Sequence, residues 1–365
     1  MTGAERVQRA LEELSSCGRI VLRPQDSNRL PPFLVADADQ ATPELVGQFA
    51  EAGQGQVYLA LSHDQCERLG LRMPVEPATA SYNQLDAIDA RAGIGSGLSA
   101  ADRAYTIRLA SSPAASAPDF KRPGHVVPLR AARHGVLERT GPTEAAVDLI
   151  RAANGGEGAV ISPLFEPRAR NLDSSKLPEV SVDEVIAHRW RTERLLTPDA
   201  TATLPTAAGS FRLLGFREEV TGNIHLAFVN GDLAQRRGVL ASYHTECLLG
   251  SHLHGELCEC SDRLEEAIAR TQADGGILIY TQISHRQRRD NPLASCEQAR
   301  RAAGETPAPA APAHSSAVVT QILGELKIES VRWLGPPLDD AAFEVVESLP
   351  YSDGFRQRRL SAARP

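Results

Sequence analysis

The stretch GLSAADRAYTI at residues 97–107, followed by RPGHVVPL at 122–129 and GVLERTGPTEAAVDL at 135–149, decides the fold of the first half. Upstream of it, Thr42 is a suitable helix cap, with proline at the first helical position and glutamate in the first turn. Strands mixed with helices continue to about Phe165, which predicts an α/β first half. The upstream runs that we expect to form strands are Arg19–Leu22, Phe33–Ala36 and Gln56–Leu61.

Downstream of residue 165 the pattern changes. Residues 166–178 are polar and lack periodicity, so they predict a linker, and residues 180–196 predict a connecting helix. The second half again mixes strands with an amphipathic helix. Strands are expected at 209–216, 225–229, 276–280 and 330–334, and helices at 262–272 and 318–326. We therefore expect a first domain over 1–165, a linker and helix over 166–200, a second domain over 201–350 and a tail over 351–365.

Two later segments have a composition that does not suit a packed core. Residues 303–316 are rich in alanine and proline, which predicts a solvated loop. The tail after Tyr351 is basic, and we expect it to fray.

The bulk composition limits the classes of function. The 365 residues carry a net charge of −7 and 42% hydrophobic residues, which argues against a broad nucleic-acid surface or a polybasic membrane patch. No apolar run approaches the roughly 18 residues that a membrane span needs. The charged N-terminus predicts an amphipathic helix and not a signal peptide. We expect a cytoplasmic protein that acts on a small molecule.

The cysteines point to metal chemistry. The chain has six, at positions 17, 66, 247, 258, 260 and 296, and a chain of this length and profile is not expected to use them as a disulfide framework. Cys247, Cys258 and Cys260 fall within 14 residues, spaced C-x10-C-x-C. The spacing alone is compatible with a zinc site or with a cluster of buried thiols.

The three motifs of the first half together resemble 3,4-dihydroxy-2-butanone 4-phosphate synthase, which converts ribulose 5-phosphate to a four-carbon phosphate and formate. The resemblance implies Mg²⁺ held by a glutamate and a histidine. In this chain the family's acidic stretch falls on residues 28–33, which contain no carboxylate, and its metal histidine falls on Pro142. A later catalytic glutamate falls on Pro163. We therefore expect no Mg²⁺ site and loss of the family's reaction.

The residues that match the family's phosphate-holding side are still present. Arginine forks and hydroxyl groups suit a phosphate dianion. The alternative is that these residues only brace the fold or a dimer interface. The set is Arg103, Thr106, His125, Arg139 and Thr143.

In the second half, HTECLLG at 244–250 and CECSDRL at 258–264 resemble motifs of GTP cyclohydrolase II. That resemblance implies that Cys247, Cys258 and Cys260 bind Zn²⁺, with water in the fourth position as the attacking group on the guanine ring. Either His252 or His254 could instead close the fourth position. The candidate catalytic residues are His244, Glu246 and Arg286.

The expected GTP contacts are largely replaced. The family's phosphate-contacting arginine falls on Ser242, and the glutamine of its Asp-Gln-Leu motif falls on Arg263. Of the loop that follows the next strand, only Arg286 matches. The Thr-Asn-Asn-Pro-x-Lys segment reads LGPPLD at 334–339. Such losses would remove several charge-assisted contacts to a triphosphate.

The sequence therefore predicts a two-domain α/β (α+β) protein that resembles the bifunctional riboflavin biosynthesis enzymes with divergent sites. We favour a repurposed zinc-dependent enzyme, a hydrolase or lyase acting on a phosphorylated or anionic small molecule. The alternatives are a non-catalytic regulatory or scaffold partner of riboflavin enzymes, and a low-activity riboflavin enzyme. A closed zinc site would favour the partner, and an open one the enzyme. We expect a homodimer, or a heteromer with a true riboflavin enzyme.

Overall fold

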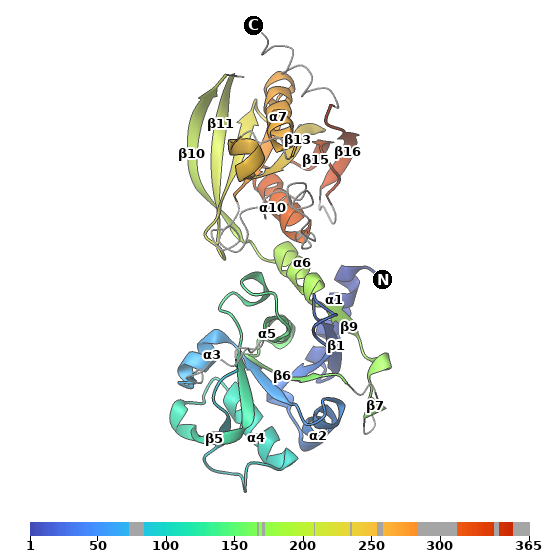
Figure 1. Cartoon of the computed structure of the whole chain (residues 1–365), viewed down its shortest axis with the longest axis vertical. Helices are drawn as coiled ribbons and strands as arrows, with labels where there is room; N and C mark the ends of the chain where they lie inside the picture. The colour runs from blue at the N-terminus through green and yellow to red at the C-terminus, as the bar shows by residue number, and fades with distance from the viewer. Residues whose placement is uncertain are drawn as a thin grey trace. The chain divides into compact units, whose positions relative to one another are not determined.

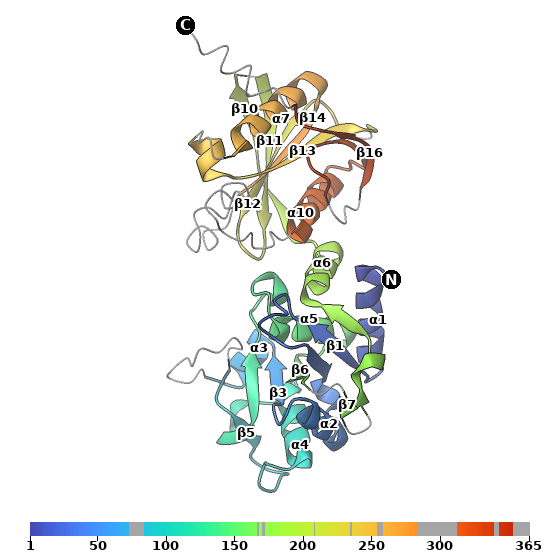
Figure 2. The same cartoon turned by 45° about the vertical axis from the view of Figure 1, so that its right-hand side comes forward.

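The chain forms two compact units, Met1–Arg189 and Trp190–Pro365 (Figures 1 and 2). The computed structural model describes residues 1–72, 84–165, 168–169, 172–207, 209–233, 236–253, 258–282, 312–338 and 343–352. Within these residues, each unit has a mixed sheet of seven strands. Both expected α/β halves are therefore confirmed.

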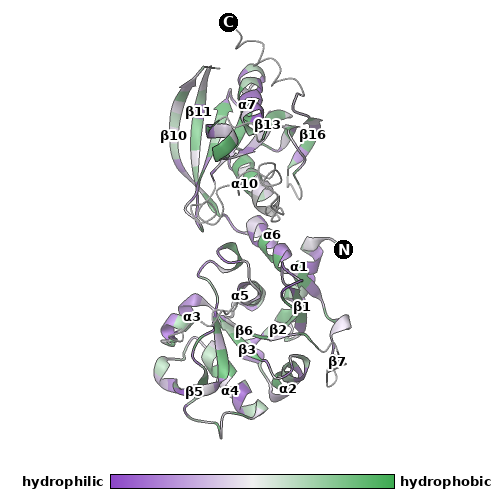
Figure 3. Cartoon of the chain, in the orientation of Figure 1, coloured by the Kyte–Doolittle hydropathy of each residue, from purple (hydrophilic) through white to green (hydrophobic). Residues whose placement is uncertain are grey.

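The first sheet has the strand order β4-β5-β3-β6-β2-β1-β9. Its central strands β2 and β6 are buried along their whole length, and Figure 3 shows this part of the unit as largely hydrophobic. Strands buried on both faces read as continuous apolar runs, which is why Phe33–Ala36 was detectable from sequence. The strands are β1 (Arg19–Arg23), β2 (Phe33–Asp37), β3 (Tyr58–Leu61), β4 (Ile88–Ala90), β5 (Phe120–Arg130), β6 (Gly158–Pro163) and β9 (Glu179–Ser181).

Helices cover both faces of this sheet. Leu34 and Ala36 of β2 share a core cluster with Phe49 of α2 and Ile107 of α4. Because side chains alternate along a strand, Phe33 and Val35 face the other side, where α1 packs against α5. Thr42 caps α2 through its hydroxyl, as expected. The helices are α1 (Gly3–Ser15), α2 (Pro43–Ala52), α3 (His63–Arg68), α4 (Ala100–Ser111), α5 (Pro142–Asn154) and α6 (Val182–Thr192).

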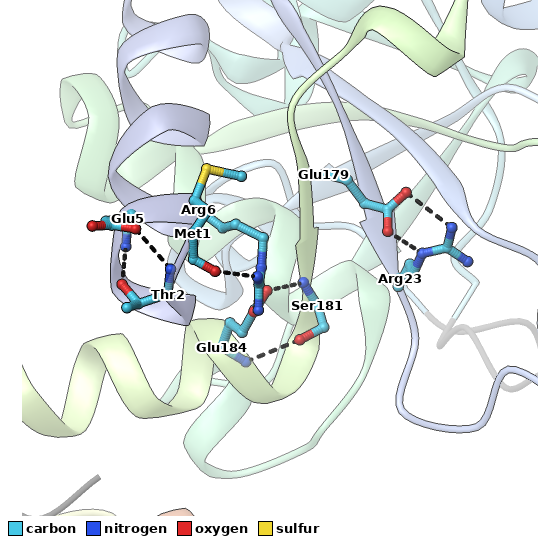
Figure 4. Close-up of polar contacts among 8 residues, drawn as sticks. All are labelled: Met1, Thr2, Glu5, Arg6, Arg23, Glu179, Ser181 and Glu184. Atoms are coloured by element: carbon cyan, nitrogen blue, oxygen red, sulfur yellow. Dashed lines mark hydrogen bonds and ion pairs between the residues drawn. The ribbon is translucent and has the colours of Figure 1, made fainter.

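The segment that the sequence predicts as a linker is bound to the first unit. It contains the short pair β7 (Arg168–Ala169) and β8 (Leu172–Asp173), and it leads into β9, which pairs in parallel with β1. Polar contacts hold β9 and the start of α6 on this unit: Arg23 forms an ion pair with Glu179, and Arg6 forms one with Glu184 (Figure 4). The Ser181 N–H also donates to Glu184 at 2.9 Å. Polar contacts of this kind leave no hydrophobic period in the sequence, and the first unit extends to Arg189.

The second sheet has the order β10-β11-β12-β14-β13-β15-β16. β10 to β12 form an antiparallel meander, and β13 pairs in parallel with both β14 and β15. Parallel strands place their carboxyl ends at one edge, where ligands commonly bind in α/β folds. The strands are β10 (Leu196–Thr206), β11 (Gly209–Glu218), β12 (Ile224–Asn230), β13 (Val239–Thr245), β14 (Gly276–Thr281), β15 (Ser330–Leu334) and β16 (Glu344–Leu349).

Two helices among the described residues cover the second sheet. On one face α7 (Cys260–Asp274) places Ala267 against Leu240 and Leu278. On the other, the Tyr243 hydroxyl contacts Ser315 of α10 (Pro312–Glu325) at 3.0 Å. The expectation of a solvated loop over 303–316 is therefore wrong for its last five residues, where Pro312 is the first residue of a helix, a position that proline tolerates. Residues 303–311 lie outside the described residues.

None of the helices in the described part of the chain is both long enough and apolar enough to cross a membrane. The basic tail was expected after Tyr351, and its residues from 353 onward lie outside the described residues.

Gln321 of α10 binds the chain where α6 ends. Its Nε2 donates to the carbonyl oxygens of Trp190 at 2.8 Å and Glu193 at 2.9 Å. Its Oε1 accepts from the N–H groups of Leu195 at 3.0 Å and Leu196 at 3.1 Å. One side chain thus satisfies two carbonyls at a helix end and two amides at a strand start, which otherwise would need water or a cap.

Replacing Gln321 by leucine keeps the volume and removes all four bonds. At roughly 1 kcal/mol for each bond, we expect the second unit to lose about 2–4 kcal/mol of unfolding free energy. Both tryptophans of the chain, Trp190 and Trp333, lie in this unit, so denaturant unfolding followed by tryptophan fluorescence measures it selectively. Gln282→Leu, at an exposed position, is the control. Equal losses in the two variants would contradict the role given to Gln321.

Candidate functional site

Three cysteines from two elements converge at the carboxyl edge of the second sheet. Cys247 follows the end of β13, before the short π-helix η5 (Leu248–His252), and Cys260 is the first residue of α7. Together with Cys258, their sulfur atoms all lie within 4.8 Å of one another, and Cys247 Sγ lies 3.8 Å from Cys258 Sγ. The distant parts of the C-x10-C-x-C pattern therefore form one ligand set.

Local hydrogen bonds prepare Cys247 to bind a cation. Its side chain is fully buried, and burial alone would disfavour the thiolate. A hydrogen bond from Cys260 outweighs this and lowers the pKa of Cys247 to about 4, with further help from the Gly250 N–H. That N–H donates to Cys247 Sγ at 3.2 Å. The thiolate is the form that binds metal.

Gly250 lies between the three ligands. A Cβ atom at this position would lie 2.6 Å from Cys258 Sγ, 2.8 Å from Cys260 Cβ and 3.3 Å from Cys247 Sγ. The first two distances are shorter than real Cβ contacts allow. The close approach of the loop to the sulfurs thus depends on glycine at this position.

The two candidate catalytic residues that the structure describes flank this cluster. His244 is buried, its Nε2 lies 2.8 Å from Ser251 Oγ, and its ring stacks on Tyr280 at 5.7 Å. Burial lowers the pKa of His244 to about 4, so the ring is neutral near pH 7. The Glu246 N–H donates to the Thr281 carbonyl at 2.8 Å. Arg286, the third candidate, lies outside the described residues.

Of the two histidines that could supply a fourth ligand, the structure describes His252. His252 Nδ1 lies 3.3 Å from the Cys247 carbonyl oxygen, and Nε2 lies 3.7 Å from Glu246 Oε1. Within the described residues the metal-type cluster comprises only the three cysteines. His254 lies outside the described residues. The arrangement therefore offers a cation three sulfurs, with His252 turned toward Glu246.

In the first unit, Thr106 and His125 converge on the same strand β4. The Ala90 N–H donates to Thr106 Oγ1 at 3.1 Å. His125 Nδ1 lies 2.9 Å from Asp89 Oδ2, and the His125 N–H donates to Asp89 Oδ1, also at 2.9 Å. Arg103 lies on α4, one turn before Thr106, and its buried Nε has no hydrogen-bond partner among the described residues. Burial lowers the pKa of this guanidinium.

Arg139 and Thr143 lie near the start of α5, away from the contacts of Thr106 and His125 with β4. Arg139 donates to the Arg130 carbonyl at 2.6 Å and forms an ion pair with Glu144. Glu144 also accepts the Ala132 N–H at 3.1 Å, and burial raises its pKa. Thr143 is buried in the first turn of α5. These contacts brace the loop before α5, and phosphate binding by this pair stays a prediction.

Sequence reasoning missed Asp89 and Gly250. Asp89 is only 1% exposed within a buried strand, so an acid inside the run Ile88-Asp89-Ala90 was the available signal. Gly250 follows its ligand cysteine by three residues, but only the converging sulfurs show why it must be small.

Comparisons with known proteins agree with this arrangement. Residues 8–187 match the family 3,4-dihydroxy-2-butanone 4-phosphate synthase, and residues 197–347 match GTP cyclohydrolase II. The riboflavin biosynthesis protein RibBA of Salinispora arenicola is 37% identical over 298 residues, covering 77% of this chain and 70% of that protein. The chain belongs to the bifunctional riboflavin biosynthesis family.

Members of the family from distant organisms match to a similar extent. RibBA of Aquifex aeolicus is 36% identical over 75% of this chain and 71% of its own length. Among solved structures, RibBX of A. baumannii, described as a two-domain 3,4-dihydroxy-2-butanone 4-phosphate synthase, is 27% identical with a TM-score of 0.74. It covers 95% of this chain and 100% of its own. The match therefore extends across both units.

These matches correct the functional hypothesis drawn from the sequence. A repurposed enzyme, or a non-catalytic partner of riboflavin enzymes, is wrong as the leading interpretation, because relatives at this identity over most of the chain are named riboflavin biosynthesis proteins. The hypothesis gave great weight to single replaced positions, such as Pro142 and Ser242, and little to the identity retained along both halves.

Proposed function

We propose that this protein is an enzyme of riboflavin biosynthesis and that its second unit acts as a zinc-dependent GTP cyclohydrolase II. The convergence of Cys247, Cys258 and Cys260 carries the proposal, because it assembles a metal-binding set within the region that matches this family. The names of the relatives, which match over 77% and 75% of this chain, support it.

The donor set fits zinc better than a hard cation. Sulfur ligands select zinc among the common biological cations, whereas Mg²⁺ prefers oxygen. The lowered pKa of Cys247 and the space left by Gly250 agree with three sulfurs around one ion. Zinc with three protein ligands supplies a Lewis acid and a source of hydroxide near neutral pH.

The chain's own residues then have distinct roles beside the ligands. Glu246 is 8% exposed, adjoins Cys247 in the chain and has its backbone fixed by a bond to Thr281, so its carboxylate would serve as a proton acceptor beside the ligand loop. Neutral His244 can exchange a hydrogen bond with Ser251 and keep that loop in place. Tyr280 fixes the plane of the His244 ring.

Substituting one ligand tests the metal proposal. We expect wild-type protein to bind about one zinc per chain, and Cys260→Ala to retain less than a quarter of it, because two thiolates rarely suffice for a stable site. Consumption of GTP, followed by mass spectrometry, should fall together with the zinc content. Cys66→Ala, a buried thiol of the first unit whose pKa burial raises to about 12, is the control. Unchanged zinc in Cys260→Ala would overturn the assignment.

For the first unit, the family match supports formation of 3,4-dihydroxy-2-butanone 4-phosphate from ribulose 5-phosphate. Asp89 and His125 form the pair best suited to move a proton there, because the buried carboxylate orients the half-exposed imidazole. The described residues of this unit do not assemble a set of three metal-type ligands, so we derive no step through Mg²⁺. Formate release from ribulose 5-phosphate, with and without Mg²⁺, tests this half, and no release under either condition would contradict it.

The expected oligomeric states stay predictions. Light scattering of the purified chain distinguishes a monomer from the expected homodimer. Mixing it with a second riboflavin enzyme in the same measurement tests the heteromer.

A further inference from the structure

Arg263 lies on α7 close to the metal ligands, and the roles proposed above do not include it. It follows Cys260 by three residues on α7, and positions i and i+3 share one face of a helix. Its Nη2 donates to Glu259 Oε2 at 2.9 Å, and Glu259 lies between Cys258 and Cys260 in the chain. Glu259 therefore ties the guanidinium to the ligand loop.

A second contact leaves the edge of this guanidinium available. Its Cζ lies 5.8 Å from the centre of the Tyr351 ring. Aromatic contact of this kind covers the face of the guanidinium and leaves its N–H groups able to donate in the plane. Within the described residues, Glu259 is the single hydrogen-bond partner of Arg263, and the side chain remains 39% exposed.

Strand β13 contributes no fixed cation to the sheet face beneath α7. Leu240 packs against α7, so by alternation Ser242 and His244 of β13 share that face. Ser242 is fully buried, and its hydroxyl has no hydrogen-bond partner among the described residues. His244 is neutral near pH 7, and the positive charge of Arg263 contributes to that. Near the ligands, the positive charge on this face comes from Arg263 of α7, whereas Arg332 of β15 lies at the far end of α7, where it pairs with Asp274.

The charge of the ligand set makes a nearby cation necessary for an anionic substrate. A divalent ion held by three thiolates carries a net negative charge. Glu246 and Glu259 add further negative charge around the same loop. A phosphate-bearing substrate would be repelled unless a cation intervened, and an arginine fork is the group best matched to phosphate oxygens.

We propose that Arg263 binds the phosphate chain of the substrate and holds it beside the metal ligands. The inference rests on the proposed function, since GTP supplies the triphosphate. It makes Arg263 a substrate-binding residue that this chain places on α7. Glu259 and Tyr351 act as the supports that aim the guanidinium.

Tripolyphosphate is the probe for a direct test, titrated by calorimetry into the zinc-loaded full chain, with metal content measured before and after. We expect Arg263→Gln to weaken binding at least about tenfold and Arg263→Lys to recover part of the loss, because lysine keeps the charge without the fork. Both variants should retain wild-type zinc. Arg237→Gln, at an arginine of the same unit that is 84% exposed, should bind like wild type.

The outcomes separate this inference from the proposed function. Binding by Arg263→Gln within twofold of wild type, or no binding by wild type, would overturn the role of Arg263. If Arg263 controls tripolyphosphate binding but wild type does not consume GTP, the inference holds and the cyclohydrolase assignment fails. Where GTP is consumed, Arg263→Gln should raise KM more than it lowers kcat, since the contact is made to the substrate and not to the reacting ring.

Discussion

Gly250→Ala is expected to empty the metal site while leaving the second unit folded. The added Cβ would lie 2.6 Å from Cys258 Sγ and 2.8 Å from Cys260 Cβ, so the loop or the sulfurs must move apart. Movement of the loop also lengthens the bond from the Gly250 N–H to Cys247 Sγ, which is 3.2 Å now. Because metal affinity falls steeply when ligand geometry is lost, we expect zinc content to drop from about one per chain to below about 0.2.

Two measurements distinguish loss of the site from loss of the fold. Metal analysis after dialysis gives the zinc content, and the absorption of a cobalt-substituted sample reports the sulfur environment. Gly324→Ala is a matched control, because that glycine lies within α10 and an added Cβ would contact nothing within 4 Å. Gly250→Ala that keeps full zinc and a wild-type cobalt spectrum would show that the loop adapts, and the steric argument would fall.

Asp148→Ala is expected to destabilise the first unit by about 3–5 kcal/mol, the range for removing one partner of a buried ion pair. Asp148 is 6% exposed, and its Oδ2 accepts the Val136 N–H at 2.8 Å and Arg189 Nη1 at 2.9 Å. Burial raises its pKa, and Arg189 opposes that rise. Alanine would leave a buried amide and a largely buried guanidinium with fewer acceptors.

Thermal unfolding followed by circular dichroism records both units, and tryptophan fluorescence records the second alone, because both tryptophans lie in it. Only the transition that fluorescence does not report, that of the first unit, should shift. Asp148→Asn, which keeps an acceptor, should lose less than alanine. Asp64→Ala removes an ion pair with Arg133 that is 70% and 56% exposed, and should cost under about 1 kcal/mol. Similar losses at positions 148 and 64 would contradict the burial argument.

Much of the fold was predictable because its elements have strong local signals. The apolar run from Ser330 to Leu334 is β15 with the same bounds, and Thr42 caps α2 as the Thr-Pro-Glu pattern indicates. The segment after residue 165 was less predictable, since its strands are two or three residues long and polar side chains hold them. The start of α10 at Pro312 was missed because an alanine-proline repeat has no hydrophobic period.

The residues of the candidate site also differ in how well the sequence predicts them. Cysteines are rare enough that Cys247, Cys258 and Cys260 stand out in the sequence, and the structure brings them together. An acid inside the run 88–90 is a weak signal, and the role of Asp89 becomes clear when β5 places His125 beside it. The position of Arg263 relative to the ligands depends on where α7 begins, a boundary that sequence patterns place poorly.

The division between the units falls inside α6, and this limits how the gene could be cut. Asp148 binds Arg189 on one side of the division, and Gln321 binds the Trp190 carbonyl on the other. A fragment that ends before Arg189 leaves the Asp148 carboxylate without its guanidinium. A fragment that starts after Glu193 leaves the Gln321 amide without the two carbonyls it binds. Fragments that share residues 182–196, each with its own copy of the helix, are therefore the ones expected to be expressed as stable separate proteins.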